Sequence, residues 1–434
     1  MKTHVENTRR GEEAGFLLCG HAATDHAYVL LAREWHPIPE DAVSERNGPN
    51  SVLAWDASFN ATMVARADDL GASIVLVHAH IGSKRPRFSP DDWRNADRLF
   101  PGASRLLAGR VSGMLVLGKN SAEGAFWFNG HASGRFDRLR VVDSPLRDLR
   151  PTADLSPPCP RPRLDRQSRA IGPKSEARLK SATIAVVGVS GGGSHVCQQI
   201  AHQGVGGLIV IDDQLVEEVQ LGRMVGTTPA DVGTSFKTAV MRRMVETIDP
   251  AVQVEEIRAR VPSRPALEAL KRADLVVAAV DTFGAREQIN AFCRRHLLPL
   301  IDIGINVRTD GEHLQSAHGQ LIVVTADSPC LRCTPLLADQ VLAREREARP
   351  PEYEINEEAT GEPQVVSMNG VLASEASNAV LDFITGYANG ARGSGWWLYD
   401  GRGGTMSRAA LPPPSSGCPA CAELGHGDFV SSRA

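Results

Sequence analysis

The sequence predicts an α/β protein of two domains, the first small and mixed, the second built on a mostly parallel sheet. Three observations support this prediction. The chain has 434 residues, which is too long for one small core. Prolines crowd the stretch from Asp143 to Arg163, so neither a helix nor a central strand can run through it. After it come an apolar strand, a glycine-rich turn, a helical pattern and a second strand, which together form a βαβ unit.

The domain limits follow from the proline-rich stretch. We expect a first domain over residues 1–142, a linker over 143–163 and a second domain over 164–434. The first domain has strand-like runs, namely AGFLLCG, AYVLLAREW, SIVLVHAH and VSGMLVLG, with helical patterns from Ser58 to Leu70 and after Pro90. The second opens with SATIAVVGVSGGGSHVCQQIAHQGV and GLIVIDD, which predict a Rossmann-like sheet with helices on both faces.

Composition and charge exclude several classes of partner. The net charge is −4 and no long basic or acidic block occurs, so neither nucleic acid nor an anionic membrane is expected to bind. The first fifteen residues are polar and charged, and no apolar run approaches the roughly 20 residues of a membrane span. We therefore expect a cytoplasmic protein that acts on small molecules and other proteins.

The stretch HAHIGSKRPRFSPDDW (78–93) contains a candidate metal site in the first domain. Alternate side chains of a strand share a face, so His78 and His80 are expected to point the same way and to be able to bind one ion. A second interpretation requires no metal. Ser89, with Pro90 at the first helical position and Asp92 three residues after it, has the pattern of a helix N-terminus with a capping box.

EEAGFLLCG near the start of the chain adds acids before a strand, and the order Glu, HxH, SxxD resembles the JAMM (JAB/MPN) zinc metallopeptidases. The resemblance implies a cytidine-deaminase-like α/β fold in which His78, His80 and Asp92 bind a catalytic zinc ion. It makes Glu13 the general base for a zinc-bound water and lets Ser89 help to hold the oxyanion. Two imidazoles and one carboxylate leave zinc an open position for a water whose pKa the metal lowers.

The glycine-rich turn of the second domain, GVSGGGSHV (188–196), predicts a nucleotide site. Glycines after a strand let a pyrophosphate approach the N-terminus of the next helix. Because Ser190 stands at the second glycine of GxGxxG, the turn alone does not specify the nucleotide, and a nicotinamide-dependent oxidoreductase is one interpretation.

Linked motifs further along the chain favour adenylation instead. RQSRAIGPKSEARLKSATIAVVGVSGGGS, VIDDQLVEEVQLGR, DVGTSFK, AAVDTFGAREQIN and GVLASEASNAVLDFITG resemble, in order and approximate spacing, the ubiquitin-activating superfamily of the ThiF/MoeB type. The resemblance covers nearly everything from Arg166 to Cys421. Gln214 and Gln220 stand where that family usually has Asp and Asn.

The resemblance assigns roles to residues of the second domain. The nucleotide turn would consist of Gly188, Gly191 and Gly193. Asp212 would bind the ribose, Arg223 and Lys237 the phosphates, and Asp281 magnesium, while Arg169 would reach across a homodimer into the partner's ATP site. These residue types suit adenylation, because cations and magnesium stabilise the charge that develops on the α-phosphate and the leaving pyrophosphate.

Eight cysteines complete the candidate residues. Two CxxC pairs are typical of a structural zinc site with four thiolates, and a redox site would not need the second pair; they are Cys330, Cys333, Cys418 and Cys421. Cys19, Cys197 and Cys293 lie in apolar or helical stretches where cysteine is usually a buried hydrophobe. The loop between Cys333 and Gly370, where thioester-forming relatives carry their cysteine, has none, which leaves Cys159 in the linker as the remaining candidate.

Both resemblances imply the same substrate. A JAMM peptidase cleaves after the C-terminal glycine of a ubiquitin-like protein, and a ThiF-type domain activates that carboxylate with ATP. The sequence therefore predicts a bifunctional enzyme of a bacterial ubiquitin-like pathway that uses ATP, Mg²⁺, a catalytic Zn²⁺ and a structural Zn²⁺, with a separate carrier enzyme as a possible partner. Activation of a sulfur carrier for thiamine, molybdopterin or cysteine synthesis is an alternative, and so is a non-catalytic scaffold that binds ubiquitin-like proteins.

Overall fold

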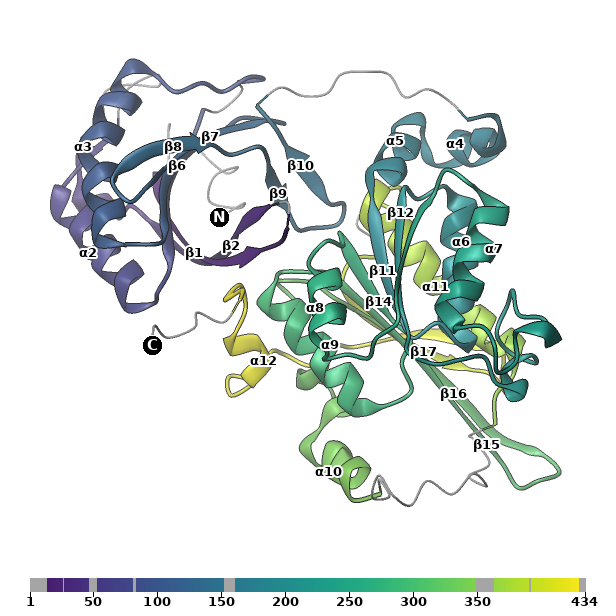
Figure 1. Ribbon diagram of the computed structural model, residues 1–434. Helices are drawn as coiled ribbons and strands as arrows, with labels where there is room; N and C mark the ends of the chain where they lie inside the picture. Colours follow the sequence, from purple (N-terminus) through teal and green to yellow (C-terminus); the bar gives the residue numbers. More distant parts are fainter. Residues whose placement is uncertain are drawn as a thin grey trace. The chain divides into compact units, whose positions relative to one another are not determined.

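A computed structural model describes residues 14–25, 27–46, 53–80, 83–151, 161–348, 363–389 and 392–428 (Figure 1). These residues form two compact units. The first contains Met1–Val141, Arg147–Ser156 and Gly425–Ala434, and the second contains Val142–Leu146 and Pro157–Leu424. No helix in the described ranges combines the length and the apolar character that crossing a membrane requires.

The first unit is built on one mixed sheet, whose described strands run in the order β2-β1-β5-β6-β7-β8. They are β1 (Ala14–Ala23), β2 (Tyr28–Pro37), β5 (Ser73–Ala79), β6 (Val111–Leu117), β7 (Ala122–Phe128) and β8 (His131–Arg135). Only β5 and β6 pair in parallel; the other neighbours are antiparallel. Two short hairpins accompany the sheet, β3 (Val43–Arg46) with β4 (Leu53–Trp55) and β9 (Leu139–Val141) with β10 (Arg147–Leu149).

Two helices cover one face of this sheet (Figure 1). α2 (Ala57–Asp69) buries Met63 and Ala67 against alternate residues of β1 and β5, and α3 (Pro90–Leu106) buries Phe100 against Trp127 of β7. The intervening strand residues form a separate core on the other face. α3 begins at Pro90 as the sequence predicts, with Ser89 as its cap. α2 begins at Ala57, one residue before the predicted Ser58, because Asp56 caps it.

The second unit has a doubly wound sheet, in the described order β13-β12-β11-β14-β15-β16-β17-β18. The parallel part consists of β11 (Thr183–Val187), β12 (Gly207–Ile211), β13 (Gln253–Ile257), β14 (Leu275–Ala278) and β15 (Leu300–Thr309). β16 (Leu314–Val324), β17 (Gly395–Asp400) and β18 (Thr405–Ala409) extend it in antiparallel fashion. The predicted Rossmann-like sheet is confirmed, with an antiparallel extension that the sequence did not indicate.

Helices lie on both faces of this sheet. One face packs against α5 (Pro173–Ser181), α6 (Gly191–Gln203), α7 (Lys237–Ile248) and α11 (Val366–Thr385). The other packs against α8 (Arg264–Leu270), α9 (Phe283–Arg295), α10 (Asp339–Ala348) and α12 (Pro419–Ala422). α4 (Asp165–Ile171) contacts α5, and short 3-10 helices include η2 (Pro162–Leu164), η3 (Glu218–Gln220), η4 (Pro229–Asp231) and η5 (Leu331–Cys333). Alternate residues of β11 enter the two cores, as a strand buried on both faces requires.

The units differ from the expected limits of 1–142 and 164–434, because the expected linker is divided between them and the end of the chain joins the first unit. Leu146 lies in the stretch expected to be linker, but its backbone N–H donates to the carbonyl of Phe383 over 2.8 Å, so this segment packs with the second unit. At the other end of the chain Gly427 pairs in parallel with His21 of β1, and the N–H of Asp428 donates to the carbonyl of His21 over 2.7 Å. The last described residues therefore belong to the first unit.

Candidate functional site

The glycine-rich turn connects β11 to α6 in a conformation that larger residues cannot adopt. Gly188 has φ of +80°, and a Cβ there would lie 2.7 Å from the carbonyl oxygen of Ala279. A Cβ on Gly193 would lie 1.9 Å from the carbonyl oxygen of Gly188. Gly191 begins the helix, so its N-terminus faces the space that the turn leaves open.

Asp212 lies directly after β12 and is fastened to this turn. Its carboxylate accepts the backbone N–H of Val189 over 3.1 Å and that of Gln214 over 3.0 Å. Burial raises the pKa of Asp212, while the nearby charge of Lys237 opposes that rise. The structure thus brings the expected ribose ligand beside the expected nucleotide turn.

Lys237 is the centre of a cluster of charges next to Asp212. Its side chain is only 2% exposed, and Nζ donates to Oε1 of Gln214 over 2.5 Å. Burial lowers the pKa of Lys237; Asp212 and Asp281 raise it, and Arg223 lowers it further. Each of these charges is therefore close enough to influence Lys237. The Nε of Arg223 is buried without a hydrogen-bond partner in the described part of the chain.

Arg169 lies apart from this cluster. It projects from α4, is 70% exposed and pairs with Asp165 of the same helix over 2.7 Å. In the described residues no hydrogen bond or ion pair joins Arg169 to Lys237 or Asp281. Within the described residues, Arg169 therefore has no contact with the candidate nucleotide site.

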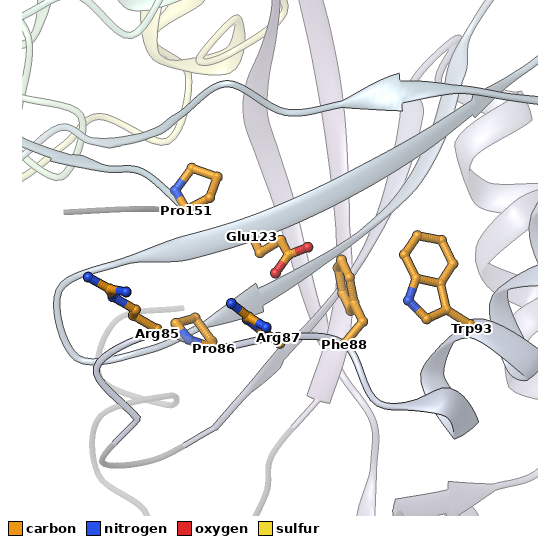
Figure 2. A pocket seen from close by; sticks show the side chains of 7 residues that line it. All are labelled: Arg85, Pro86, Arg87, Phe88, Trp93, Glu123 and Pro151. Atoms are coloured by element: carbon orange, nitrogen blue, oxygen red, sulfur yellow. The ribbon is translucent and has the colours of Figure 1, made fainter. Parts of the chain in front are cut away.

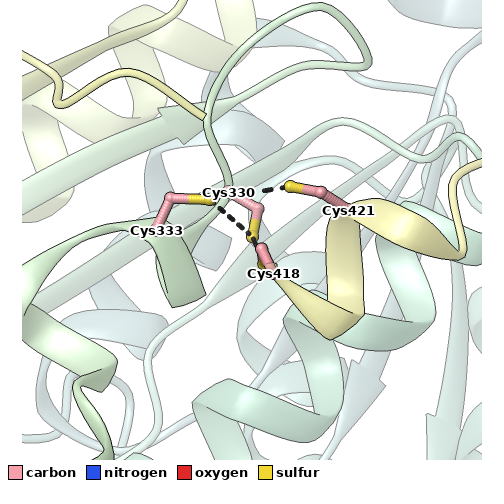
Figure 3. A group of neighbouring side chains, drawn as sticks. All are labelled: Cys330, Cys333, Cys418 and Cys421. Atoms are coloured by element: carbon pink, nitrogen blue, oxygen red, sulfur yellow. Dashed lines mark hydrogen bonds between the residues drawn. The ribbon is translucent and has the colours of Figure 1, made fainter. Parts of the chain in front are cut away.

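The four cysteines of the CxxC pairs converge as the sequence predicts (Figure 3). Cys330 Sγ lies 3.5 Å from Cys418 Sγ and 3.9 Å from Cys333 Sγ, and Cys333 Sγ lies 3.7 Å from Cys421 Sγ. Four thiolates bound tetrahedrally to zinc at about 2.3 Å are separated by about 3.8 Å. The spacing of the sulfurs therefore fits a structural zinc ion.

In the first unit, His78, His80 and Asp92 also converge. Each offers a ligand atom, and these atoms lie within 4.8 Å of one another. Nε2 of His78 is buried without a hydrogen-bond partner in the described residues and lies 3.6 Å from Oδ1 of Asp92. Burial, with a smaller contribution from His80, lowers the pKa of His78 to about 4 despite the opposing charge of Asp92. A buried neutral imidazole with an unused nitrogen, beside a carboxylate oxygen, suits a metal ligand set.

The other carboxylate oxygen of Asp92, Oδ2, takes part in the capping box of α3. Oδ2 accepts the backbone N–H of Ser89 over 2.7 Å and the Ser89 hydroxyl over 2.8 Å, and the N–H of Asp92 donates back to Oγ over 3.1 Å. The two interpretations of this motif are therefore compatible, since capping uses Oδ2 and leaves Oδ1 toward His78. Glu13 lies outside the described residues; Ala14, which follows it in sequence, is the partner of His78 in the β1–β5 pairing.

Comparison with known proteins identifies the family of the second unit. The ThiF family matches residues 164–420, more than half of the chain. The chain belongs to the ThiF family. This agrees with the adenylating superfamily that the linked motifs resemble, and not with a nicotinamide-dependent oxidoreductase.

Curated relatives of this ThiF chain include proteins named for adenylation. The chain is 37% identical over 175 residues to the SAMP-activating enzyme E1 of Haloferax volcanii, covering 39% of this chain and 61% of that protein. It is 35% identical over 167 residues to the sulfur carrier protein adenylyltransferase of Thermus thermophilus, covering 38% and 59%. The chain thus spans less than two thirds of the length of these two relatives. A solved structure of Escherichia coli MccB matches with a TM-score of 0.49 at 20% identity, covering 63% of this chain and 74% of that one.

Asp231 anchors the loop that carries Arg223 in the ThiF unit. The sequence alone did not indicate a role for this acid. Its carboxylate accepts two hydrogen bonds from Arg243 of α7, each 2.8 Å, as well as the N–H and hydroxyl of Thr228. The hydrogen bonds from Arg243 contribute most to holding the pKa of Asp231 far below its usual range. The Thr-Pro-x-Asp pattern of a capping box was the available signal.

A buried ion pair holds the peptide that precedes Asp281. Arg286 of α9 pairs with Asp302 of β15, and both side chains are almost wholly buried. Arg286 also donates to the carbonyl of Val280 over 2.6 Å. The N-terminus of α9 is held in addition by Glu345 of α10, whose carboxylate accepts the N–H groups of Phe283 and Gly284 over 2.7 Å each. Several interactions therefore fix the position of Asp281.

The remaining described cysteines do not suit nucleophilic catalysis. Cys19, Cys197 and Cys293 are fully buried. Burial raises the pKa of Cys19 and of Cys197 to about 12 and that of Cys293 still further, so their reactive thiolates do not form near neutral pH. Cys159 lies outside the described residues.

Proposed function

We propose that the second unit is an ATP-dependent adenylyltransferase that activates the C-terminal glycine of a ubiquitin-like or sulfur-carrier protein. The observation that carries this proposal is the geometry beside the glycine turn of a ThiF-family chain, where Asp212 accepts the N–H of Val189 and buried Lys237 donates to Gln214. The charges of Arg223 and Asp281 also act on the pKa of Lys237. In the proposed reaction a carboxylate oxygen of the glycine attacks the α-phosphorus of ATP, and the bond to the bridging oxygen breaks to release pyrophosphate. The product is an acyl-adenylate.

The residues divide this work by position and charge. Asp212 suits the ribose hydroxyls, because a carboxylate fixed at the end of β12 accepts hydrogen bonds there. Lys237 and Arg223 suit the phosphates, where their positive charges stabilise the negative charge that develops as pyrophosphate leaves. A magnesium ion held by Asp281 would add positive charge at the same place.

The fate of the acyl-adenylate remains part of the proposal. The described residues provide no exposed thiol outside the zinc cluster, so the acyl group is expected to pass directly to a nucleophile on another protein. That nucleophile belongs either to a carrier enzyme for protein conjugation or to a sulfur donor that converts the adenylate into a thiocarboxylate. The name of the Thermus relative, a sulfur carrier protein adenylyltransferase, supports the second route.

The test is ATP–pyrophosphate exchange with a ubiquitin-like protein that ends in glycine. We expect exchange that requires the intact tail and that Asp281→Ala abolishes. Asp213→Ala is the matched control, because Asp213 follows β12 as Asp281 follows β14, but it pairs with the exposed Arg260. Exchange that persists in Asp281→Ala, or that does not depend on the terminal glycine, would refute the proposal.

For the first unit we propose a zinc peptidase that cleaves after the C-terminal glycine of the same substrate. This second function is favoured by the buried Nε2 of His78, which has no hydrogen-bond partner among the described residues and lies 3.6 Å from Oδ1 of Asp92, with His80 close by. The ligands would leave zinc a position for water, and Ser89 and Glu13 have the proposed supporting roles. We expect the wild type to contain two zinc ions per chain. His80→Ala should contain one and should lose cleavage. A zinc content of one in the wild type would favour a scaffold that only binds ubiquitin-like proteins.

A further inference from the structure

A pocket of about 360 Å³ opens in the first unit beside the loop that leads into α3 (Figure 2). Its walls include the side chains of Arg85, Arg87, Phe88, Trp93 and Glu123. The two arginines and Phe88 come from the loop that leads into α3, Trp93 from the first turn of α3, and Glu123 from β7. The volume is at the small end for a ligand pocket, with room for one or two side chains.

The pocket shares a wall with the proposed metal site. The ring centroid of Phe88 lies 6.2 Å from that of His78 and 5.4 Å from that of Trp93. Phe88 directly precedes Ser89, and Trp93 directly follows Asp92. Consequently the N-terminus of α3, which presents Asp92 to His78, also forms part of the pocket wall. A substrate peptide bound at the proposed metal site would place one of its neighbouring residues near the pocket.

The pocket carries an excess of positive charge. Glu123, the one acid among the described residues of its wall, pairs with Arg135 over 2.5 Å. The guanidinium of Arg135 lies 4.8 Å above the ring of Trp93. The pair of Glu123 with Arg135 is neutral overall. Arg85 and Arg87 are exposed, and neither forms an ion pair within the described part of the chain. Two uncompensated guanidinium groups therefore face the pocket beside two aromatic rings.

We propose that this pocket binds an acidic side chain of the peptide substrate next to the scissile bond, so that the first unit selects acidic sequences. The proposal rests on the zinc-peptidase function proposed above. Guanidinium groups bind carboxylates through charge-assisted, often bidentate hydrogen bonds. Phe88 and Trp93 provide apolar surface for the methylene groups of Glu or Asp. A lysine in the same place would meet like charges and lose its hydration.

Cleavage of three matched peptides by the full chain tests this selection. The peptides share a Gly-Gly sequence before the scissile bond and carry Glu, Gln or Lys at one flanking position. We expect kcat/KM to fall by at least about tenfold from Glu to Gln and again to Lys, and the preference to weaken at high salt. Arg87→Glu in combination with Arg85→Glu should invert the order. Arg94→Glu is the matched control, because Arg94 lies on α3 outside the pocket and pairs with Asp91.

Binding separates this proposal from the peptidase proposal. Tryptophan fluorescence should report binding of the Glu peptide, and Trp93→Phe should remove the change. His80→Ala should retain binding, since His80 is not part of the pocket wall. Binding that depends on Arg85 and Arg87 without any cleavage would support the pocket and refute the peptidase. Cleavage without discrimination among the three peptides, or discrimination that survives the double charge reversal, would refute the pocket.

Discussion

Lys237 donates a hydrogen bond to Gln214 over 2.5 Å although the lysine side chain is almost wholly buried. The partner is a neutral amide, at a position where the resembled family usually has Asp. Gln214 therefore orients the ammonium group without neutralising it, and burial lowers the pKa of Lys237. Desolvation makes a buried cation a stronger ligand for an entering anion than an exposed one. The pair presents positive charge beside the glycine turn.

Replacing this cation should impair adenylation more than folding. We expect Lys237→Met to lower kcat/KM for ATP in pyrophosphate exchange by about 100-fold, because one electrostatic contact to developing charge contributes roughly 3 kcal/mol. Methionine fills a similar volume, so the melting temperature should change little. Lys180→Met, at an exposed lysine of α5, is the control. Unchanged exchange in Lys237→Met would remove this residue from the site.

Asp231 should stabilise the ThiF unit at neutral pH but not in acid. Arg243 and Thr228 hold the pKa of Asp231 far below its unfolded value, so the unfolded chain takes up this proton first as the pH falls. The stabilisation is present above about pH 4 and is lost as the pH falls through the folded pKa. Asp231→Asn should lower the free energy of unfolding, measured with urea at pH 7, by about 2–3 kcal/mol.

The difference in free energy of unfolding between the wild type and Asp231→Asn should then shrink as the pH falls below about 4. In that range the Asp231 carboxylate of the wild type also becomes protonated. Glu218→Gln, which replaces an exposed acid of η3 in the same region, should unfold like the wild type at both pH values. A difference that stays constant from pH 7 to acid would show that the shape of Asp231, and not its charge, carries the effect.

The parts of both sites that the sequence predicted are those that depend on local spacing. HxH places two imidazoles on one strand face, SxxD closes a capping box within one turn, and each CxxC pair brings two thiols together before any tertiary contact forms. The glycine turn belongs to the same class, because Gly188 and Gly193 meet across five residues. In such motifs the spacing of the residues in the sequence determines most of the geometry.

The parts that the sequence missed depend on burial and on distant contacts. Arg286 and Asp302 are charged residues that composition alone assigns to the surface, yet they form a buried pair between α9 and β15. Glu345 reaches the N-terminus of α9 from 61 residues away in sequence. Likewise nothing near Gly427 indicates that it pairs with His21 of the first unit. No periodicity or spacing encodes these relationships.

The pair of Arg286 with Asp302 offers a double-mutant cycle. Removing one partner should cost about 3–5 kcal/mol of unfolding free energy, because it leaves a buried charge uncompensated. The combination Arg286→Met with Asp302→Leu should cost far less than the two single changes added together. Urea unfolding of the four proteins gives the coupling. Additive costs would mean that the two side chains act independently.

The same double variant should still impair adenylation. It removes the donor to the carbonyl of Val280, which directly precedes Asp281. We therefore expect a higher Mg²⁺ concentration for half-maximal exchange, with kcat at saturating Mg²⁺ changed less. An unaltered Mg²⁺ dependence would limit the role of Arg286 to stability.

The cysteine cluster should bind zinc independently of the histidine site. Cys418→Ser should lower the zinc content by one ion per chain and destabilise the second unit. The second unit should lose about 4 kcal/mol of unfolding free energy when free zinc exceeds the dissociation constant of the cluster about 1,000-fold. His80→Ala should also remove one ion but leave the unfolding of the second unit unchanged, because its ligand set lies in the first unit. A wild-type zinc content that Cys418→Ser does not change would contradict a metal at the cluster.

Arg169 allows a test of whether two copies of the chain share a site. It is exposed and pairs within α4 in the described residues, and the family resemblance implies that it acts in the ATP site of a partner chain. We expect Arg169→Ala and Asp281→Ala each to abolish exchange alone. In a mixture of the two, half of the chains form mixed dimers, each of which has one site with both residues intact. Exchange should return to about a quarter of the wild-type rate, as random pairing of chains gives. A mixture that stays inactive under conditions where labelled subunits exchange would show that Arg169 does not complete the site of a partner.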